Sequence, residues 1–257
     1  MAPRVGIGII TCNRKDVLVE TIARVRAHTT MPCALVVADD GSQDGTADLV
    51  RSQNVALVTG QNMGIAWNKN RALFLLGAVI QCDVVILLED DSFPTQDGWE
   101  KEWVLATEHW GHVNLAGEWF RDSFLKGTGT VDDPILSKDV TAQCSGFSRT
   151  ALLYGGYFDS RFRGYGFEHL EHSRRLARVG YGGSFEDIEG EVMPIFKLLK
   201  GSIEVTSPVS FSNQADRDRN KLLCQELLFD ETYRMPWRDD VELTQFRAEM
   251  SQAVRRG

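Results

Sequence analysis

Three consecutive carboxylates, Glu89, Asp90 and Asp91, are the side chains of this sequence best suited to chemistry. They directly follow the apolar run 84–88, and Pro94 comes soon after them. A short apolar run bounded by turn residues is typical of a strand buried in a parallel sheet, and open α/β sheets bind ligands at the carboxyl ends of their strands. Because Mg²⁺ and Mn²⁺ prefer hard oxygen ligands and in turn hold phosphates, we expect a metal or phosphate site here. A solvated acidic turn is the alternative.

The charge balance disfavours one class of partner. The chain has 257 residues, with 36 acidic against 28 basic, and a net charge of -8. The sequence shows no basic block, so a general nucleic-acid binder is disfavoured. A nucleotide ligand stays open, because a bound metal can supply positive charge. The length and the 43% hydrophobic content suit one large α/β domain, with or without a small appendage.

Cysteine usage and hydropathy indicate the compartment. The cysteines are Cys12, Cys33, Cys82, Cys144 and Cys224. Their odd number and wide spacing argue against a disulfide framework or a zinc site and fit a reducing compartment. The sequence shows no signal-peptide pattern and no apolar run of membrane-spanning length. We therefore expect a cytoplasmic protein without an integral membrane segment.

The first half of the chain alternates predicted strands and helices. The apolar patterns predict strands at 5–10, 34–38, 55–59 and 84–88, and helices at 16–28, 46–52 and 65–79. Asp16 is the expected N-cap of the first helix. This order is typical of an α/β fold with a Rossmann-like, mostly parallel central sheet flanked by helices. Right-handed crossovers would bring the turns 11–14, 39–44 and 89–91 to one sheet edge. The glycine-rich dinucleotide and P-loop fingerprints are both missing from the sequence.

Four motifs in this half carry a family resemblance. They are Ile-Thr-Cys-Asn-Arg, Val-Ala-Asp-Asp-Gly-Ser-Gln-Asp-Gly-Thr, Asn-Met-Gly-Ile-Ala-Trp-Asn-Lys-Asn and Leu-Leu-Glu-Asp-Asp. In order and spacing, over residues 5–94, they resemble the nucleotide-sugar half of a family 2 glycosyltransferase with the GT-A fold. The resemblance implies an inverting hexosyltransferase of the DxD type.

The resemblance also implies roles for the donor-binding residues. Thr11 and Asp39 match positions that contact the nucleobase or its ribose. Lys69 falls where the family often has an arginine near the phosphates, and Asn62 and Asn70 would hold the loop geometry. The full donor-binding set implied is Thr11, Asn13, Arg14, Asp39, Asn62, Lys69, Glu89 and Asp90.

The three acids match the DxD motif with one departure. Asp91 aligns with the direct ligand of Mn²⁺ or Mg²⁺, and Asp90 would reach the ribose. Glutamate is not the commonest first acid, and Glu89 would act indirectly, through water. The sequence has no histidine after His172, although some GT-A enzymes use a late histidine as a metal ligand. The diphosphate and water would therefore complete the metal shell.

Residues 143–181 resemble the acceptor half of the same family. Gln-Cys-Ser-Gly-Phe-Ser-Arg, Gly-Gly-Tyr-Phe-Asp-Ser-Arg-Phe and Gly-Tyr-Gly-Phe-Glu-His-Leu-Glu-His-Ser-Arg-Arg-Leu-Ala-Arg-Val-Gly-Tyr carry the match. Glu168 aligns with the glutamate of the family's Glu-Asp pair. His169 stands where the family usually has its catalytic aspartate, and Glu171 aligns with a second acid. These two acids are followed by an aligned arginine, Arg175.

Inverting transfer needs a group that takes the acceptor's hydroxyl proton as the sugar leaves the diphosphate. Glu168 is the first candidate base and His169 the second, since a neutral imidazole has an ordinary pKa of about 6.5. The alternative is that Glu168 stabilises a helix N-terminus and that Glu171 and Arg175 form a surface pair.

The remaining segments give weaker expectations. Trp99, Trp103 and Trp110 recur at helical spacing and predict core packing. A strand is expected at 113–119, with Glu118 and Trp119 at its end as acceptor contacts together with Glu171, and a loop without strands at 120–138. Helices are expected near 215–229 and 239–255. The last carries an apolar stripe of Leu243, Phe246, Met250 and Val254, which would dock on the body or form a homodimer.

One domain over 1–257 is therefore expected, with a nucleotide-sugar half (1–95), an acceptor and catalytic half (96–190) and a C-terminal extension (191–257). The expected activity is metal-dependent, inverting transfer from a nucleoside-diphosphate sugar to a hydroxyl acceptor. UDP-sugar is favoured, with GDP or dTDP as alternatives, and the acceptor stays open between glycan, lipid-linked saccharide, protein and modified nucleobase. A nucleotidyltransferase and a non-catalytic nucleotide-sugar-binding relative are the competing functions.

Overall fold

A computed structural model describes residues 2–206, 213–230 and 232–254. Strand β1 (Val5–Thr11) lies between β2 (Cys33–Asp39) and β4 (Val84–Glu89), and β3 (Ala56–Thr59) flanks β2. All of these pairings are parallel. Every residue of β1 is buried, which explains why its sequence does not alternate apolar and polar residues. The predicted parallel sheet of the first half is confirmed.

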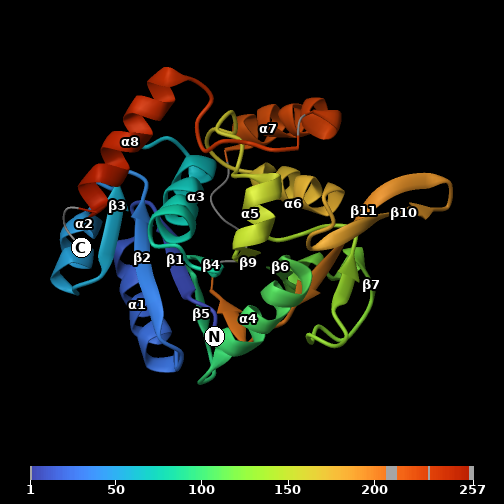
Figure 1. The fold of residues 1–257 in the computed structure, drawn as a ribbon, viewed down its shortest axis with the longest axis horizontal. Helices are drawn as coiled ribbons and strands as arrows, with labels where there is room; N and C mark the ends of the chain where they lie inside the picture. The colour runs from blue at the N-terminus through green and yellow to red at the C-terminus, as the bar shows by residue number, and fades with distance from the viewer. Residues whose placement is uncertain (1, 207–212, 231, 255–257) are drawn as a thin grey trace.

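Helices cover both faces of this sheet (Figure 1). They are α1 (Lys15–His28), α2 (Thr46–Ser52), α3 (Ile65–Phe74) and α4 (Trp99–Trp110). The predicted helix 65–79 is α3 followed by a π-helical turn, η1 (Leu75–Val79). The prediction that Asp16 caps α1 is wrong, because Arg14 occupies the cap position and Asp16 lies inside the first turn. Asp16 still faces the positive end of the helix dipole there.

The second half extends the sheet with mixed pairing. Strand β9 (Cys144–Ser148) runs antiparallel to both β4 and β6 (His112–Leu115). Beyond β6 lie β11 (Glu191–Leu199), β8 (Ile135–Ser137) and β7 (Phe124–Lys126), and β10 (Gly183–Ile188) pairs with β11. The α/β class is as predicted, and the antiparallel strands belong to this half.

Two predictions for the second half are wrong. The strand expected at 113–119 ends at Leu115, and residues 118–123 form the 3₁₀ helix η2 (Glu118–Ser123). The expected loop 120–138 contains β7 and β8. These strands have three residues each, too few for a periodic pattern to show in the sequence.

A small second sheet holds the chain that follows the acidic motif. Strand β5 (Ser92–Pro94) pairs antiparallel with β12 (Ile203–Val205). Beyond β12, the backbone N–H of Thr206 donates to the carbonyl of Asp91 at 3.0 Å. The backbone at Asp91 is therefore fixed by a segment from the far end of the chain.

Two apolar cores lie on the two faces of the main sheet. One packs α1 and α4 against the sheet, and Trp99, Trp103 and Trp110 are at most 6% exposed there, so their predicted core role is confirmed. The other holds α3, α5 (Arg149–Gly155), α6 (Glu168–Arg178), α7 (Gln214–Glu226), the 3₁₀ turn η3 (Leu227–Phe229) and α8 (Asp240–Val254).

The apolar stripe of α8 is used within the chain. Phe246 packs edge-on against Trp67 with ring centroids 5.3 Å apart, and Met250 is also buried. Residue 255, the last of the predicted helix, and the side chain of Val254 fall outside the described residues. Within the described ranges, no helix has the length and apolar character needed to cross a bilayer.

Candidate active site

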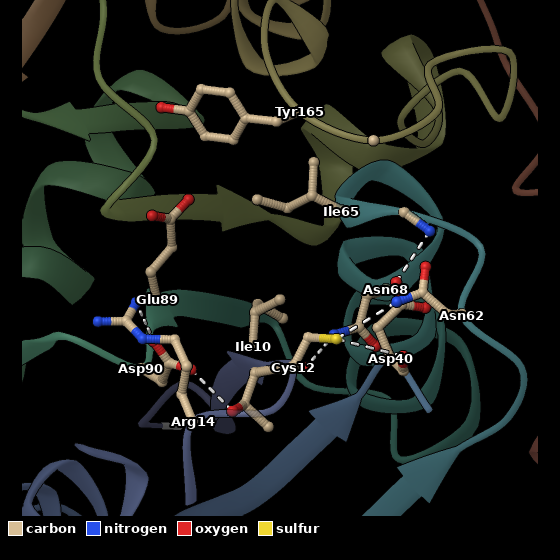
Figure 2. Close-up of a pocket in the computed structure, with 13 residues that line it drawn as sticks. Ile10, Cys12, Arg14, Asp40, Asn62, Ile65, Asn68, Glu89, Asp90 and Tyr165 are labelled. Carbon is tan, nitrogen blue, oxygen red and sulfur yellow. Dashed lines mark hydrogen bonds and ion pairs between the residues drawn. The ribbon is translucent and has the colours of Figure 1, made fainter. Parts of the chain in front are cut away.

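A cavity of about 460 Å³ opens at the carboxyl ends of β1, β2 and β4 (Figure 2). It is lined by Ile10, Thr11, Cys12, Arg14, Asp40, Asn62, Gly64, Ile65, Asn68, Glu89, Asp90, Gly164 and Tyr165. The three turns predicted to converge, 11–14, 39–44 and 89–91, each contribute to this wall. The volume lies in the range of small-molecule and cofactor sites.

The cavity has two chemically different ends. Figure 2 shows Arg14, Glu89 and Asp90 at one end and Cys12, Asp40 and Asn62 at the other. Tyr165, from the segment before α6, lies across the opening from the strand ends. An elongated ligand that brings a cation to the first end and a polar, uncharged part to the second would match this division.

At the acidic end, one guanidinium holds both aspartates. Arg14 Nη1 lies 2.8 Å from Asp90 Oδ1 and 3.0 Å from Asp91 Oδ2. Thr11 Oγ1 donates to the other oxygen of Asp90 at 2.7 Å. Burial raises the pKa of Asp90 to about 7, although Arg14 and Thr11 act in the opposite direction. In this structure Asp91 contacts the guanidinium of Arg14, which Asp90 shares, and its predicted role as a metal ligand stays a prediction.

The carboxylate oxygens at the acidic end are of the chemical type that binds a divalent metal. Carboxylate oxygens are the ligands that Mg²⁺ and Mn²⁺ prefer, usually with phosphate and water completing the shell. The described residues contain no ready-made cluster of three or more His, Cys, Asp or Glu side chains around a metal position. A metal at Asp91 would have to replace Arg14, whose side chain is 34% exposed and so has room to move.

At the other end, Asp39, the last residue of β2, and Asp40, which follows it, have different positions. Asp39, the predicted base contact, lies outside the cavity lining and accepts hydrogen bonds from Ser42 and from Thr59 Oγ1 at 2.7 Å. Asp40 does line the cavity. Its carboxylate accepts from the backbone N–H groups of Met63 at 2.9 Å and Gly64 at 2.8 Å.

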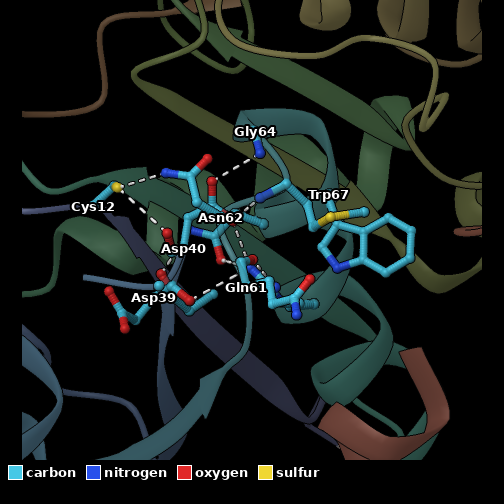
Figure 3. A network of polar contacts seen from close by, with 12 residues as sticks. Cys12, Asp39, Asp40, Gln61, Asn62, Gly64 and Trp67 are labelled. Carbon is cyan, nitrogen blue, oxygen red and sulfur yellow. Dashed lines mark hydrogen bonds and ion pairs between the residues drawn. The ribbon is translucent and has the colours of Figure 1, made fainter. Parts of the chain in front are cut away.

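The predicted asparagines join loops. Asn13 Oδ1 accepts from the backbone N–H of Gln43 at 2.7 Å, which connects the first and second turns. Asn62 Nδ2 donates to Cys12 Sγ at 3.3 Å (Figure 3). Asn70 was expected to hold its own loop, but it exchanges two hydrogen bonds with the backbone of Phe158 and so joins α3 to the second half.

Lys69 lies between two glutamates from different halves of the chain. It is 2% exposed, and its Nζ lies 3.0 Å from Glu168 Oε1 and 3.4 Å from Glu89 Oε1. Burial would lower the pKa of Lys69, but Glu168 and Glu89 outweigh burial and raise it. Burial would raise the pKa of Glu168, but Lys69 and His169 outweigh burial and hold this pKa far below its ordinary range. Burial raises the pKa of Glu89 despite Lys69.

The second base candidate lies beside the first. The His169 ring has Nδ1 3.5 Å from Glu168 Oε1 and Nε2 3.2 Å from the carbonyl of Val140. Helix α6 begins at Glu168, so this carboxylate also faces the helix N-terminus. Oε2 of Glu168 and Nδ1 of His169 are buried without a hydrogen-bond partner among the described residues. Each candidate base therefore has one such atom, although others on α6, such as Glu171 Oε2 and His172 Nδ1, share this property.

The alternative of a surface pair between Glu171 and Arg175 is wrong. Both side chains are at most 3% exposed, and Arg175 Nε lies 2.5 Å from Glu171 Oε1. Arg175 also donates to the backbone carbonyl of Tyr157 at 2.6 Å. The pair ties α6 to the segment before it, and this position gives Glu171 no opening to the cavity.

The structure does not bring the predicted acceptor residues Glu118 and Trp119 to the cavity. They lie on η2, and Trp119 is 40% exposed. Sequence reasoning also missed the four other lining residues with polar side chains: Cys12, Asp40, Asn68 and Tyr165. Each of them lies inside a quoted motif, so the motifs located the site but did not show which side chain faces inward.

The comparisons with known proteins agree with this geometry. Residues 7–126 match the family model of Glycosyl transferase family 2. This segment belongs to glycosyl transferase family 2. The predicted resemblance to this family is confirmed, and the chain is a glycosyltransferase. No curated protein sequence matches it.

Solved structures share the GT-A fold at low identity. The mannosyltransferase PcManGT from Pyrobaculum calidifontis, in complex with GDP-Man and Mn²⁺, has a TM-score of 0.54 and 14% identity, covering 100% of this chain and 76% of its own. GalNAc-T7 with UDP, GalNAc and Mn²⁺ has a TM-score of 0.62 and 13% identity, covering 97% and 54%. TarS 1–349 from S. aureus with UDP has a TM-score of 0.51 and 14% identity, covering 67% and 54%. The glycosyltransferase therefore spans about half of the last two chains, and the likeness shows the fold.

Proposed function

We propose that this glycosyltransferase is metal-dependent and inverting, and that it moves a sugar from a nucleoside-diphosphate sugar to a hydroxyl acceptor. The observation that carries the proposal is the cavity with Asp90 and its cation at one end and Cys12, Asp40 and Asn62 at the other. A diphosphate suits the first end and a nucleoside the second. Two structures of the same fold were solved with a nucleotide or nucleotide sugar and Mn²⁺.

The donor residues follow from this orientation. Asp91 is the proposed ligand of Mn²⁺ or Mg²⁺, Asp90 contacts the ribose, and Glu89 acts through water. Thr11 fixes Asp90 by its hydrogen bond. A bound metal would neutralise the charge that develops on the leaving diphosphate. We favour UDP as the nucleotide, with GDP and dTDP as alternatives.

The proposed reaction forms a bond between the acceptor oxygen and the anomeric carbon while the bond from that carbon to the diphosphate breaks. The acceptor's proton goes to a base. Glu168 is the first choice, since it is ionised and stands next to Glu89 through their shared partner Lys69. The same ion pair weakens Glu168 as a base. His169 is therefore the alternative, and its Nδ1 is the atom that would take the proton.

Calorimetry tests donor binding. UDP, GDP and dTDP should be titrated into the protein with and without Mn²⁺, and we expect binding of one of them to depend on the metal. Asp91→Asn should abolish that dependence. Metal-independent binding in the wild type, or unchanged binding in D91N, would remove the metal from the proposal.

The base assignment is tested by comparing two variants. Glu168→Gln should retain nucleotide binding and lose transfer, and His169→Asn should retain both in part. The reverse pattern would make His169 the base. If both variants and the wild type bind nucleotide without transferring or hydrolysing any donor sugar, the competing proposal of a non-catalytic nucleotide-sugar-binding relative is favoured. The replacement of the family's catalytic aspartate by His169 is what favours that competitor.

The proposal also covers the division of the chain, its location and its oligomeric state. We propose the division into a nucleotide-sugar half (1–95), an acceptor and catalytic half (96–190) and a C-terminal extension (191–257). A cytoplasmic location is supported by five free cysteines. A homodimer through the C-terminal helices would have to use their outward faces, because Phe246 is buried within the chain, and sedimentation velocity tests it.

A further inference from the structure

A buried carboxylate of the C-terminal helix reaches the back of the donor cavity. Glu249 on α8 accepts from Arg71 Nε at 3.0 Å and from Arg71 Nη2 at 3.0 Å, which is a bidentate ion pair. Trp67 Nε1 donates to the same carboxylate at 3.0 Å. Glu249 is 6% exposed and Arg71 is completely buried. The pair is therefore shielded from solvent, where electrostatic contacts are strongest.

Arg71 connects Glu249 to the cavity wall. Its Nη1 lies 2.8 Å from Asp40 Oδ1, and its Nη2 donates to the carbonyl of Gln61 at 2.8 Å. Asp40 in turn accepts from the backbone N–H groups of Met63 and Gly64. Figure 3 shows Asp40, Gln61, Asn62 and Gly64 together with Trp67 in this network. The loop 61–64 is thus held from behind at both of its ends.

The backbone at Gly60, just before this loop, also lies very close to Glu249. A Cβ at Gly60 would collide with the Glu249 carboxylate and would lie 2.7 Å from Arg71 Nη2. Glycine at position 60 therefore lets the loop approach the ion pair. Asn62 and Gly64, which follow in the same loop, line the cavity.

We propose that Glu249 is a positioning residue for nucleotide binding, acting through Arg71 and Asp40 on the loop 61–64. This inference rests on the proposed function for its ligand. Glu249 lies outside residues 7–126, the segment that matches the family. Without its carboxylate, Arg71 has Asp40 as its remaining charged partner, and the loop loses the geometry that presents Asn62 and Gly64 to the nucleoside.

The experiment compares Glu249→Gln and Glu249→Ala with Glu100→Gln. Glu100 is a matched control, because it is also a fully buried glutamate and accepts from Thr30 and Met31, away from the cavity. For the Glu249 variants we expect the donor KM, and the Kd of the nucleotide with Mn²⁺, to rise about tenfold, the size usual for coupled sites. The kcat at saturating donor should change less than about threefold, because Glu249 contacts no reacting atom. E100Q should lower Tm and leave KM unchanged.

Amide hydrogen exchange gives a readout that needs no ligand. In the Glu249 variants the amides of Met63 and Gly64 should exchange about tenfold faster or more, and in E100Q at the wild-type rate. If E249A does not fold, amide exchange in E249Q tests whether Glu249 holds the loop. If wild-type protein binds no nucleotide, the proposed function fails while the exchange still tests the coupling. Lower Tm in the Glu249 variants with unchanged exchange and unchanged KM would overturn the proposal.

Discussion

Arg14 and Lys69 show what single residues contribute to the donor cavity. Each is a cation shared by two acids: Asp90 and Asp91 for Arg14, Glu89 and Glu168 for Lys69. Their environments differ, since the Arg14 side chain is 34% exposed and Lys69 is buried. A half-exposed cation can turn toward solvent when another cation takes its place beside the carboxylates, whereas a buried one cannot. We therefore expect substitution of Arg14 to change metal binding and substitution of Lys69 to change the stability of the fold.

Arg14→Ala should tighten the binding of Mn²⁺ alone severalfold, because the substitution removes the charge that competes for Asp91. The same variant should bind the nucleoside diphosphate more weakly if Arg14 turns to the phosphates. Isothermal titration at pH 8 measures both constants. Arg51→Ala is the control, since it removes an equal charge from an exposed pair with Asp48. Equal Mn²⁺ affinities in the two variants would contradict the competition.

Lys69→Met should destabilise the fold by about 3–5 kcal/mol, because it leaves buried carboxylates without their counter-charge. Urea denaturation measures the loss. The double variant K69M with Glu168→Gln should recover a large part of it, since no buried charge of Glu168 then remains unpaired. If the two substitutions are simply additive, the ion pair between Lys69 and Glu168 contributes little.

At the scale of elements, the start of α3 fixes how the two halves meet. Gly64 precedes this helix with φ of 93°, in the region that favours glycine, and a Cβ there would lie 2.8 Å from the backbone nitrogen of Gly164. Both glycines line the cavity. A side chain at position 64 would therefore push the second half away from the donor-binding half.

Gly64→Ala and Gly180→Ala compare a glycine at the contact between the two halves with one in open space. Gly180 has φ of 87°, and no described atom lies within 4 Å of a Cβ built there. G180A should cost about 1–2 kcal/mol for the left-handed conformation. G64A should cost a further ~1–3 kcal/mol, because its ψ of 169° lies in a region almost confined to glycine and because of the collision, and it should weaken nucleotide binding. Chemical denaturation measures the unfolding free energy, and calorimetry measures nucleotide binding. Equal losses of stability in the two variants would mean that the second half moves aside at no cost.

The sequence predicted these elements unevenly, for physical reasons. Long buried runs such as 84–88 predicted the parallel strands well, because burial on both faces leaves a continuous apolar pattern. Strands β7 and β8 were missed because three residues carry no period. Within the site, Asp39 and Asp40 are adjacent and identical in type, so their residue types do not show which one faces the cavity; contacts with distant residues, Thr59 for Asp39 and Met63 and Gly64 for Asp40, accompany the difference. The partnership of Lys69 with Glu168 joins distant segments and has no local signal.

At the scale of the whole molecule, the buried polar groups set the response to acid. His112 joins β6 to α6, with Nδ1 2.8 Å from the carbonyl of Gly146 and Nε2 3.0 Å from Ser173 Oγ. Burial lowers the pKa of His112 to about 4. The unfolded chain takes up a proton near pH 6.5 and the folded chain does not, so stability is lost as pH falls from about 6.5 to 4.

His112→Gln should remove this acid sensitivity, which amounts to roughly 3 kcal/mol over that window. Burial raises the pKa of Asp90 to about 7, so Asp90 protonation favours the folded state as pH falls and partly masks the effect. The measurement is therefore the difference in unfolding free energy between wild type and H112Q at pH 7.5, 6.0 and 4.5. A constant difference across these values would show that His112 is not protonated on unfolding.

The contact between Thr206 and Asp91 has a consequence for synthesis on the ribosome. A nascent chain that ends after residue 126 already contains the whole segment that matches the family. It lacks Thr206, which fixes the backbone of Asp91, and it lacks Glu168 and Glu249, the partners of Lys69 and Arg71. Lys69 and Arg71 on α3 would then have only Glu89 and Asp40 as charged partners, which makes their burial less favourable. The donor cavity should therefore close late, when the C-terminal residues have left the exit tunnel.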